Sequence, residues 1–240
     1  MQNTGNILID LHGHSAGISR CCRAPHNEIL DAALARGLDG IVLSNHYEKG
    51  YVRDGDVQEF VTRYLAEFDR ATEYADTVGA RVFFGVEVSM ILYPKVHLLV
   101  YGVGEDFLRE YPCLYDMTQE ELYRAVSAAG GCVVQAHPFR GGTTVLDPAY
   151  LDGIEVNCHP IYGKSYAEDL LRIGGETGLA VTCGGDYHAD TAYRAKCGVY
   201  LPETVRDTFD LARHIKSARE FRLCIQEPNC EQVYDEVFVR

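Results

Sequence analysis

Short apolar runs alternate with longer amphipathic segments along nearly the whole chain. The short runs are typical of buried strands, and the longer segments place apolar residues at the spacing of one helix face. The pattern predicts strands at residues 7–9, 40–44, 81–88, 95–103, 132–136, 153–157, 179–183, 199–201 and 221–226. It predicts helices at residues 25–37, 57–78, 120–129, 167–177 and 209–218. Such alternation favours an α/β protein with a mainly parallel sheet, either open or closed into a barrel.

The alternation runs without a visible break. No stretch rich in Gly, Ser or Pro separates two halves, and no segment repeats at a fixed period. A length of 240 residues also lies within the usual range of one α/β barrel. We therefore expect a single domain over residues 1–240.

The composition is that of an ordinary globular protein, with 47% hydrophobic and 24% charged residues, which excludes a disordered chain. Acidic residues dominate: 22 Lys+Arg stand against 35 Asp+Glu, a formal net charge of −13. Nucleic acids and anionic membranes bind faces that are rich in Lys and Arg. We therefore expect neither an extended nucleic acid nor a membrane as a partner, whereas a small phosphorylated substrate is compatible with this charge.

The cysteines and the N-terminus bear on the cellular compartment. The nine cysteines are odd in number, and no two of them have Cys-x-x-Cys spacing. Residues 1–10 lack the positive and long apolar regions of a secretory signal, and no apolar stretch approaches the roughly 20 residues of a membrane span. These features predict a reducing, cytoplasmic location.

Side chains that bind metals stand at the ends of successive predicted strands. They are His12, His14, His46, Glu87, His97, His137, Asp186 and His188. The carboxyl ends of parallel strands open onto one face, so we expect these side chains to meet there. Imidazole and carboxylate ligands suit zinc, manganese or iron. The spacing therefore predicts a metal site at that face.

Seven short motifs follow one another in a recognisable order. They are Asp10-Leu-His-Gly-His-Ser15, Ser44-Asn-His46, Gly85-Val-Glu-Val-Ser89, His97-Leu-Leu-Val-Tyr-Gly102, Ala136-His-Pro-Phe-Arg140, Gly153-Ile-Glu-Val-Asn157 and Gly185-Asp-Tyr-His-Ala189. Over residues 7–200 the sequence thereby resembles the PHP (polymerase and histidinol phosphatase) family. The resemblance implies a distorted, TIM-like (β/α)7 barrel that hydrolyses phosphate esters with two or three divalent metal ions.

The resemblance also implies a distribution of the ligands. One metal would be held by His12, His14, Glu87 and Asp186. Glu87 would bridge to a second metal, held by His97 and His137. A third metal would be shared by His46 and His188 with one ligand from the loop after the His-x-His motif.

That loop departs from the family pattern. Arg20 or Cys21 stands where the family usually has the ligand, and Asn45 replaces the aspartate of the usual Thr-Asp-His. The third site is therefore vacant or weak, or it is completed by Cys21, Cys22 or His26.

The site chemistry predicts hydrolysis of the phosphate ester of a small molecule, similar to histidinol phosphatase activity, by a hydroxide that the metals activate. Asp186 and His188 are the candidates for moving the proton, and Arg140 for stabilising charge on the phosphoryl group. Phosphate contacts are expected from cationic side chains in loops after strands, namely Arg20, Arg23, Arg140 and Lys164. Asp10 and Glu155 are expected to hydrogen-bond to the metal-binding residues and orient them, without binding the metals themselves.

Three other interpretations stay open at this point. An amidohydrolase-type barrel also begins with His-x-His, although it usually needs a bridging lysine or carboxylate on a strand. A nuclease-type phosphodiesterase acting on DNA ends would use the same metals, but the net charge of −13 argues against it. A metal-binding module without catalysis would fit the altered first loop. Metal content together with turnover separates these possibilities.

Overall fold

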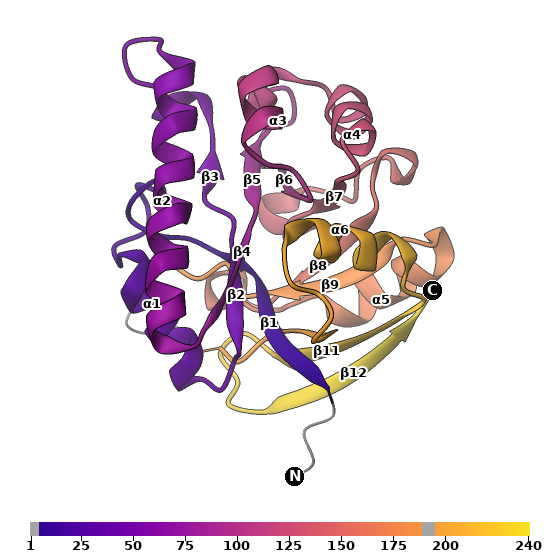
Figure 1. The fold of residues 1–240 in the computed structure, drawn as a ribbon. Coiled ribbons are helices and arrows are strands. Elements are labelled where there is room, and N and C mark those ends of the chain that lie inside the picture. The colour runs from indigo at the N-terminus through magenta and orange to yellow at the C-terminus, as the bar shows by residue number, and fades with distance from the viewer. Residues whose placement is uncertain (1–4, 189–194) are drawn as a thin grey trace.

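The computed structural model describes residues 5–188 and 195–240, and over these residues the chain is an α/β protein. The described strands form two six-stranded sheets, with helices packed around them (Figure 1). The predicted α/β class is thus confirmed.

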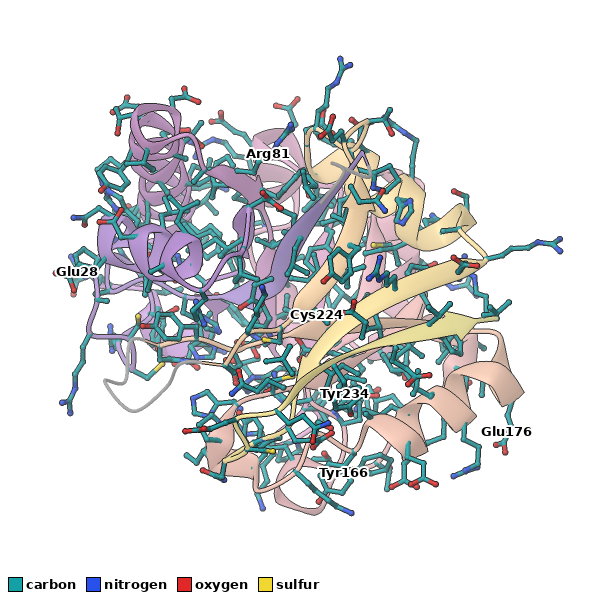
Figure 2. All side chains as sticks on the ribbon, turned by 90° about the horizontal axis from the view of Figure 1, so that it is seen from below. Glu28, Arg81, Tyr166, Glu176, Cys224 and Tyr234 are labelled. Carbon is teal, nitrogen blue, oxygen red and sulfur yellow. The ribbon has the colours of Figure 1, made fainter. Side chains whose placement is uncertain are left out.

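The first sheet has the strand order β12-β11-β10-β1-β2-β4. Its strands are β1 (Asn6–Gly13), β2 (Gly40–Leu43), β4 (Arg81–Phe84), β10 (Gly198–Pro202), β11 (Glu220–Gln226) and β12 (Val233–Val239). β1, β2 and β4 are parallel, whereas β10, β11 and β12 join antiparallel. β11 and β12 cross one face of the molecule (Figure 2), where Arg222 forms an ion pair of 2.6 Å with Asp235.

The second sheet has the order β3-β5-β6-β7-β8-β9. Its strands are β3 (His46–Tyr47), β5 (Val86–Ser89), β6 (His97–Tyr101), β7 (Cys132–Gln135), β8 (Gly153–Asn157) and β9 (Ala180–Gly184). β6 is antiparallel to both of its neighbours, and the remaining pairs are parallel.

Apart from one short helix, the described α-helices follow the predicted amphipathic segments. The α-helices are α1 (His26–Ala35), α2 (Val57–Val78), α3 (Glu105–Glu110), α4 (Gln119–Ala128), α5 (Ala167–Thr177) and α6 (Thr208–Ser217). Single 3-10 turns are η1 (Lys49–Tyr51), η2 (Leu114–Asp116), η3 (Arg140–Gly142), η4 (Pro148–Tyr150) and η5 (Pro160–Tyr162). Local sequence fixes several of the helix starts. α4, for example, begins with a capping box in which Thr118 and Glu121 satisfy each other's backbone N–H groups.

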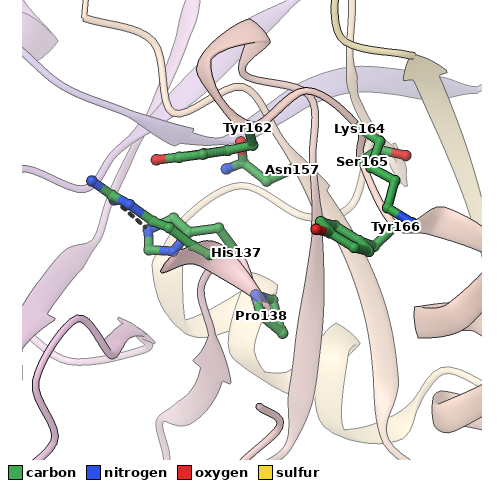
Figure 3. A pocket seen from close by; sticks show the side chains of 8 residues that line it. His137, Pro138, Asn157, Tyr162, Lys164, Ser165 and Tyr166 are labelled. Carbon is green, nitrogen blue, oxygen red and sulfur yellow. Dashed lines mark hydrogen bonds between the residues drawn. The ribbon is translucent and has the colours of Figure 1, made fainter. Parts of the chain in front are cut away.

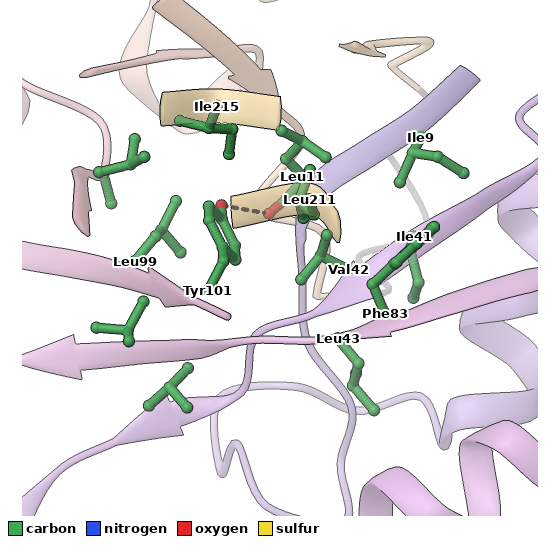
Figure 4. Packing of buried hydrophobic residues seen from close by; sticks show 14 of the residues in the cluster. Ile9, Leu11, Ile41, Val42, Leu43, Phe83, Leu99, Tyr101, Leu211 and Ile215 are labelled. Atoms are coloured by element: carbon green, nitrogen blue, oxygen red, sulfur yellow. Dashed lines mark hydrogen bonds between the residues drawn. The ribbon is translucent and has the colours of Figure 1, made fainter. Parts of the chain in front are cut away.

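One hydrophobic core connects the two sheets. Leu11 of β1 lies beside Leu211 of α6, and Tyr101 of β6, in the second sheet, lies next to them (Figure 4). The Tyr101 hydroxyl donates a hydrogen bond of 2.8 Å to the Leu11 carbonyl, so the one polar atom of this buried ring is satisfied. No helix within residues 5–188 and 195–240 is long and apolar enough to cross a membrane.

The sheets meet at two seams. Gly85 separates β4, which pairs with β2, from β5, which pairs with β3, so the single strand predicted at residues 81–88 is divided. A Cβ at Gly85 would lie 2.5 Å from Val42 Cγ1, which explains why a glycine stands there. At the other seam Gly13 forms an isolated bridge with Tyr187, just beyond β9.

The predicted TIM-like (β/α)7 barrel with a mainly parallel sheet needs correction. Within the described residues the strands pair into two mixed sheets, and no closed barrel is seen. The turn between β5 and β6 is far shorter than the dozen or more residues of a parallel crossover, so β6 returns antiparallel. β3, β12 and α3 were not predicted. The expectation of a single domain over residues 1–240 stays a prediction.

Candidate metal centre

The eight predicted metal-binding side chains converge where the strand ends of both sheets meet. His12 and His14 lie at the end of β1, His46 opens β3, Glu87 lies on β5, His97 opens β6, His137 follows β7, and Asp186 and His188 follow β9. Because β6 runs antiparallel, its first residue reaches the same edge as the last residues of the parallel strands. We call these eight side chains the polar cluster.

The first group in the polar cluster joins both sheets. One ligand atom from each of His12, His14, Glu87 and Asp186 lies within 4.8 Å of the others, and all four residues are buried. His14 Nε2 is 3.0 Å from Asp186 Oδ1, and His12 Nε2 is 3.3 Å from Glu87 Oε1. Two imidazoles and two carboxylates at these distances fit one divalent cation.

Glu87 is shared with a second group, which also contains His46 and His97. The Glu87 Oε1 atom lies 2.7 Å from His97 Nδ1 and 3.0 Å from His137 Nε2. Glu87 therefore occupies the place that a carboxylate bridging two cations would take.

A third group consists of three imidazoles, those of His14, His46 and His188. The His14 and His188 rings stack with their centres 4.2 Å apart, and the His14 and His46 rings are 4.4 Å apart. Three imidazoles at this distance would repel one another if protonated, so the group suits neutral rings around a cation.

Two cluster residues adopt backbone conformations that are rare for residues other than glycine. His137 has φ 30° and Asp186 has φ 51°, each shortly after the end of a strand. Such residues cost on the order of 1–3 kcal/mol and gather at functional sites. The strained turns direct both side chains back over the strand ends.

The donor set fits a metal rather than a network of hydrogen bonds. Among the described residues, His12 Nε2, His46 Nδ1 and Glu87 Oε2 are buried without a hydrogen-bond partner. His46 Nδ1 and Glu87 Oε2 are in close contact, but not in hydrogen-bonding geometry. Buried polar atoms are normally paired, so three orphaned atoms facing one another indicate a cation site.

The carboxylates of the cluster stay ionised, as metal ligands must. Burial alone would raise the pKa of the Glu87 carboxyl, but the imidazoles of His97 and His46 outweigh burial and hold that pKa well below its usual range. The pKa of Asp186 is lowered by nearby imidazoles in the same way. Burial lowers the pKa of His14, so its ring is neutral. Burial alone would lower the pKa of His46, but Glu87 outweighs burial and raises it to about 10, and nearby carboxylates raise the pKa of His12 in the same way. A cation bound by these two rings would displace their protons.

Glu155 and Asp10 lie behind the cluster. Glu155 Oε1 accepts a hydrogen bond of 2.9 Å from His12 Nδ1, which leaves Nε2 facing the cluster. Its Oε2 accepts from the backbone N–H of His137 at 2.9 Å. Asp10 Oδ1 accepts from the backbone N–H groups of His12 and Gly185, at 3.0 and 2.8 Å. A carboxylate that orients a metal-binding histidine from behind is a common device in metal sites.

The four cationic residues predicted near phosphate lie at different distances from the cluster. Arg140 Nη1 is 3.3 Å from His137 Nε2 (Figure 3). Arg140 and Lys164 both line a small pocket beside His137. The Lys164 amine, however, lies 4.3 Å from the centre of the Tyr166 ring. Arg20 and Arg23 are exposed in the loop of residues 15–24. The Arg20 guanidinium lies 4.8 Å from the centre of the Tyr51 ring, and the Arg23 N–H donates to the His188 carbonyl at 3.4 Å. The structure thus brings Arg140 within hydrogen-bonding distance of a cluster side chain.

Tyr162 is a site residue that the sequence analysis missed. Its hydroxyl donates a hydrogen bond of 2.7 Å to Asp186 Oδ2, while the other oxygen of Asp186 faces His14. The Arg140 guanidinium lies 5.0 Å from the centre of the Tyr162 ring. In Figure 3, Tyr162 extends toward His137 on one side of the pocket, and Tyr166 lies on the other. The one signal in the sequence is that Tyr162 follows a predicted strand end in the loop 158–166.

The last motif reaches the edge of the described residues. Gly185 to His188 are described, and Asp186 and His188 take part in the cluster. Ala189, which ends the motif, lies outside the described residues.

Comparison with known proteins bears on the fold. No family model and no curated protein matches the sequence. A two-domain protein from Bacteroides vulgatus that contains a predicted PHP-like metal-dependent phosphoesterase matches with a TM-score of 0.65 and 19% identity. The match covers 93% of this chain, which spans 66% of the length of that protein.

Two further solved structures are similar. PsfC from Pseudomonas syringae has a TM-score of 0.58 at 17% identity, covering 97% of this chain and 92% of its own. An amidohydrolase from Chromobacterium violaceum with bound sulfate has a TM-score of 0.52 at 19% identity, covering 75% and 87%. At these identities the likeness establishes a shared fold.

Proposed function

We propose that this chain, which shares its fold with a PHP-like metal-dependent phosphoesterase, hydrolyses the phosphate ester of a small molecule. The observation that carries the proposal is the polar cluster itself. Three overlapping groups of imidazoles and carboxylates have His14, His46 and Glu87 in common, each in two groups, and orphaned buried atoms face one another inside the cluster. Adjacent cation sites that share a carboxylate are the arrangement that phosphoryl transfer uses.

Two or three divalent ions, of zinc, manganese or iron, are the proposed cofactors. His12, His14, Glu87 and Asp186 would hold one ion, and Glu87, His97 and His137 would hold a second. His46 and His188 would hold a third. When bound, such ions supply a hydroxide at neutral pH and neutralise charge on the phosphoryl oxygens.

The chain's own side chains complete the proposed reaction. Arg140, beside His137, would bind a phosphoryl oxygen through its guanidinium fork. Its position explains why the loop after β7 carries a cation in an acidic protein. His188 is partly exposed, and its Nδ1 donates a hydrogen bond of 2.6 Å to the Asp186 carbonyl. Where no ion occupies the third site, its Nε2 would carry the proton between the site and the leaving group, with Asp186 beside it. Arg20, Arg23 and Lys164 would attract the anionic substrate to the rim.

The proposal also covers the type of barrel, the class of substrate and the location in the cell. The two sheets meet at both seams, which supports a strongly distorted version of a TIM-like (β/α)7 barrel. A histidinol-phosphatase-like substrate and a cytoplasmic location are proposed on the sequence resemblance and the cysteine pattern. The net charge of −13 supports a small substrate rather than an extended nucleic acid.

The test is a turnover screen on protein whose metal content has been measured. Phosphomonoesters, histidinol phosphate among them, phosphodiesters and amides are offered with and without a chelator. We expect chelator-sensitive release of phosphate from monoesters, abolished in Glu87→Gln and retained in the control Glu120→Gln, whose carboxylate is exposed on α4. Bound metal without hydrolysis of any phosphate ester would contradict the proposal. Preferential amide hydrolysis would favour an amidohydrolase, the activity named for one similar structure.

A further inference from the structure

The loop after the His-x-His motif places two buried serines behind His14. Ser15 and Ser19 have no exposed surface, and Asn45, which follows β2, and Glu67 of α2 are almost as deeply buried. The four side chains form one series of hydrogen bonds that leads from α2 to the Nδ1 atom of His14. We call these four side chains the supporting network. A hydroxyl has a single hydrogen to donate, so each of its bonds restricts the next one.

The supporting network begins at Glu67, which only accepts hydrogen bonds. Arg70 Nη2 donates to Glu67 Oε2 at 2.6 Å, and the Ser15 hydroxyl donates to Glu67 Oε1 at 2.8 Å. The one hydrogen of the Ser15 hydroxyl is thereby used. Its oxygen therefore accepts the hydrogen bond of 3.0 Å that Asn45 Nδ2 donates.

The backbone fixes the orientation of the Asn45 amide independently. The Ser15 backbone N–H, which can only donate, lies 2.8 Å from Asn45 Oδ1. That atom is therefore the amide oxygen, and it also accepts from the Ser19 hydroxyl at 2.8 Å. Because this bond uses the one hydrogen of Ser19 Oγ, the Ser19 oxygen is left as an acceptor.

Two nitrogen atoms converge on the Ser19 oxygen. The His46 backbone N–H donates to it at 3.0 Å, and His14 Nδ1 lies 3.1 Å from it. Since Ser19 has no second hydrogen, the hydrogen of the contact with His14 belongs to Nδ1. A neutral His14 ring then has its lone pair on Nε2, the atom that lies 3.0 Å from Asp186 Oδ1 inside the polar cluster.

We propose that Ser19 and Asn45 are positioning residues that keep the proton of His14 on Nδ1 and thereby make Nε2 the metal-binding atom. In free histidine the proton prefers Nε2, so a ring without this partner would present the wrong nitrogen to the cluster. A metal-binding histidine is oriented by whatever accepts its other N–H. Here the acceptor is a hydroxyl, and an amide sets its direction. The inference rests on the metal binding in the proposed function and does not require phosphate hydrolysis.

The first experiment determines the tautomer of His14 in the metal-free full chain by proton–nitrogen correlation NMR of the imidazoles at mildly alkaline pH. The signals of His14 are identified by their absence in His14→Gln. We expect the proton on Nδ1 in the unaltered protein. Ser19→Ala removes the acceptor of this N–H, so the proton should move to Nε2 in most molecules.

Asn45→Ala separates a directing role from simple packing, because it leaves Ser19 in place and frees its hydrogen. That hydrogen can then be donated to His14 Nδ1, so the His14 proton should again move to Nε2. Ser44→Ala is the matched control, since the buried Ser44 hydroxyl donates instead to the Gly13 carbonyl, at 3.4 Å. The His14 proton should stay on Nδ1 in this variant.

Circular dichroism shows which variants fold, and the tautomer of the unaltered protein is decisive by itself. A His14 proton on Nε2 in the unaltered protein would overturn the inference. A proton that stays on Nδ1 in folded Ser19→Ala or Asn45→Ala would overturn it as well.

The second experiment measures the consequence for metal binding by isothermal titration with zinc. Affinity should fall by about 10- to 100-fold in Ser19→Ala, the usual effect of losing an outer partner of a ligand. It should be unchanged in Ser44→Ala. Equal affinities in the two variants would refute a role of Ser19 in preparing His14 for the metal.

The outcomes separate this inference from the proposed function, because the tautomer is measured without metal or substrate. Hydrolysis of phosphate esters by a chain whose His14 carries its proton on Nε2 would refute the inference alone. A proton on Nδ1 and zinc binding that depends on Ser19, without hydrolysis of any phosphate ester, would support the inference and refute the phosphoesterase.

Discussion

At the scale of single residues, the centre depends on side chains that hold the metal-binding groups in place. Glu155 fixes His12 from behind, and Tyr162 holds one oxygen of Asp186 while the other faces His14. Imidazoles and carboxylates rotate freely unless a second partner fixes them. The arrangement of the cluster therefore rests on residues beyond the predicted ligands.

Replacing Tyr162 by Phe removes only the hydroxyl that donates to Asp186. We expect metal affinity to fall by about 10- to 100-fold, the usual effect of losing an outer partner of a ligand. Isothermal titration with zinc and with manganese measures this. Tyr166→Phe is the matched control, because Tyr166 lines the same pocket without contacting Asp186. Equal affinities in the two variants would show that Tyr162 does not position the carboxylate.

At the scale of elements, the end of β9 determines how closely the two sheets approach. A Cβ at Gly184 would lie 2.4 Å from Glu155 Oε1 and 2.6 Å from His12 Cβ. Real Cβ contacts are never this short, so β1, β8 and β9 can come together here only around a glycine. The same close approach brings Asp186, two residues later, to His14.

Gly184→Ala should therefore displace Glu155 or His12 and reduce the amount of bound metal. We expect a loss of thermal stability as well, since overpacking costs about 1–3 kcal/mol. Gly175→Ala is the control, because that position on α5 has open space around it and should gain up to about 1 kcal/mol. Calorimetry and elemental analysis of the two variants provide the comparison. Unchanged metal content in Gly184→Ala would contradict this account of the seam.

At the scale of the whole molecule, the carboxylates of the cluster contribute to the formal net charge of −13. Glu87 and Asp186 stay ionised in the buried interior, where water cannot screen them. Two divalent ions would offset about four of the negative charges. Metal binding should therefore stabilise the fold as well as supply the chemistry.

Removing the metals with a chelator should lower the melting temperature. A ligand that binds only the native state at 100 times its Kd stabilises by about 2.7 kcal/mol. For a chain of this length that corresponds to roughly 5–10 °C. Differential scanning calorimetry measures the shift, and adding zinc or manganese back should restore the original value. Glu87→Gln should show little of this response, and an equal shift in that variant would place the stabilising ion elsewhere.

The sequence by itself determined the class and the chemistry. Periodicity is a local property, so the alternation of segments identified the helices and most strands, and the α/β class followed. The positions of histidines and carboxylates at strand ends identified the residues that meet in the cluster. His97 was placed just within its predicted strand, residues 95–103, and nothing local revealed that this strand runs antiparallel.

Only the tertiary structure decided how these parts are arranged. Strand direction, the division into two sheets and the outer strand β12 depend on contacts between segments far apart in the sequence, which periodicity does not record. The same holds for Tyr162, which meets Asp186 across 24 positions of the chain.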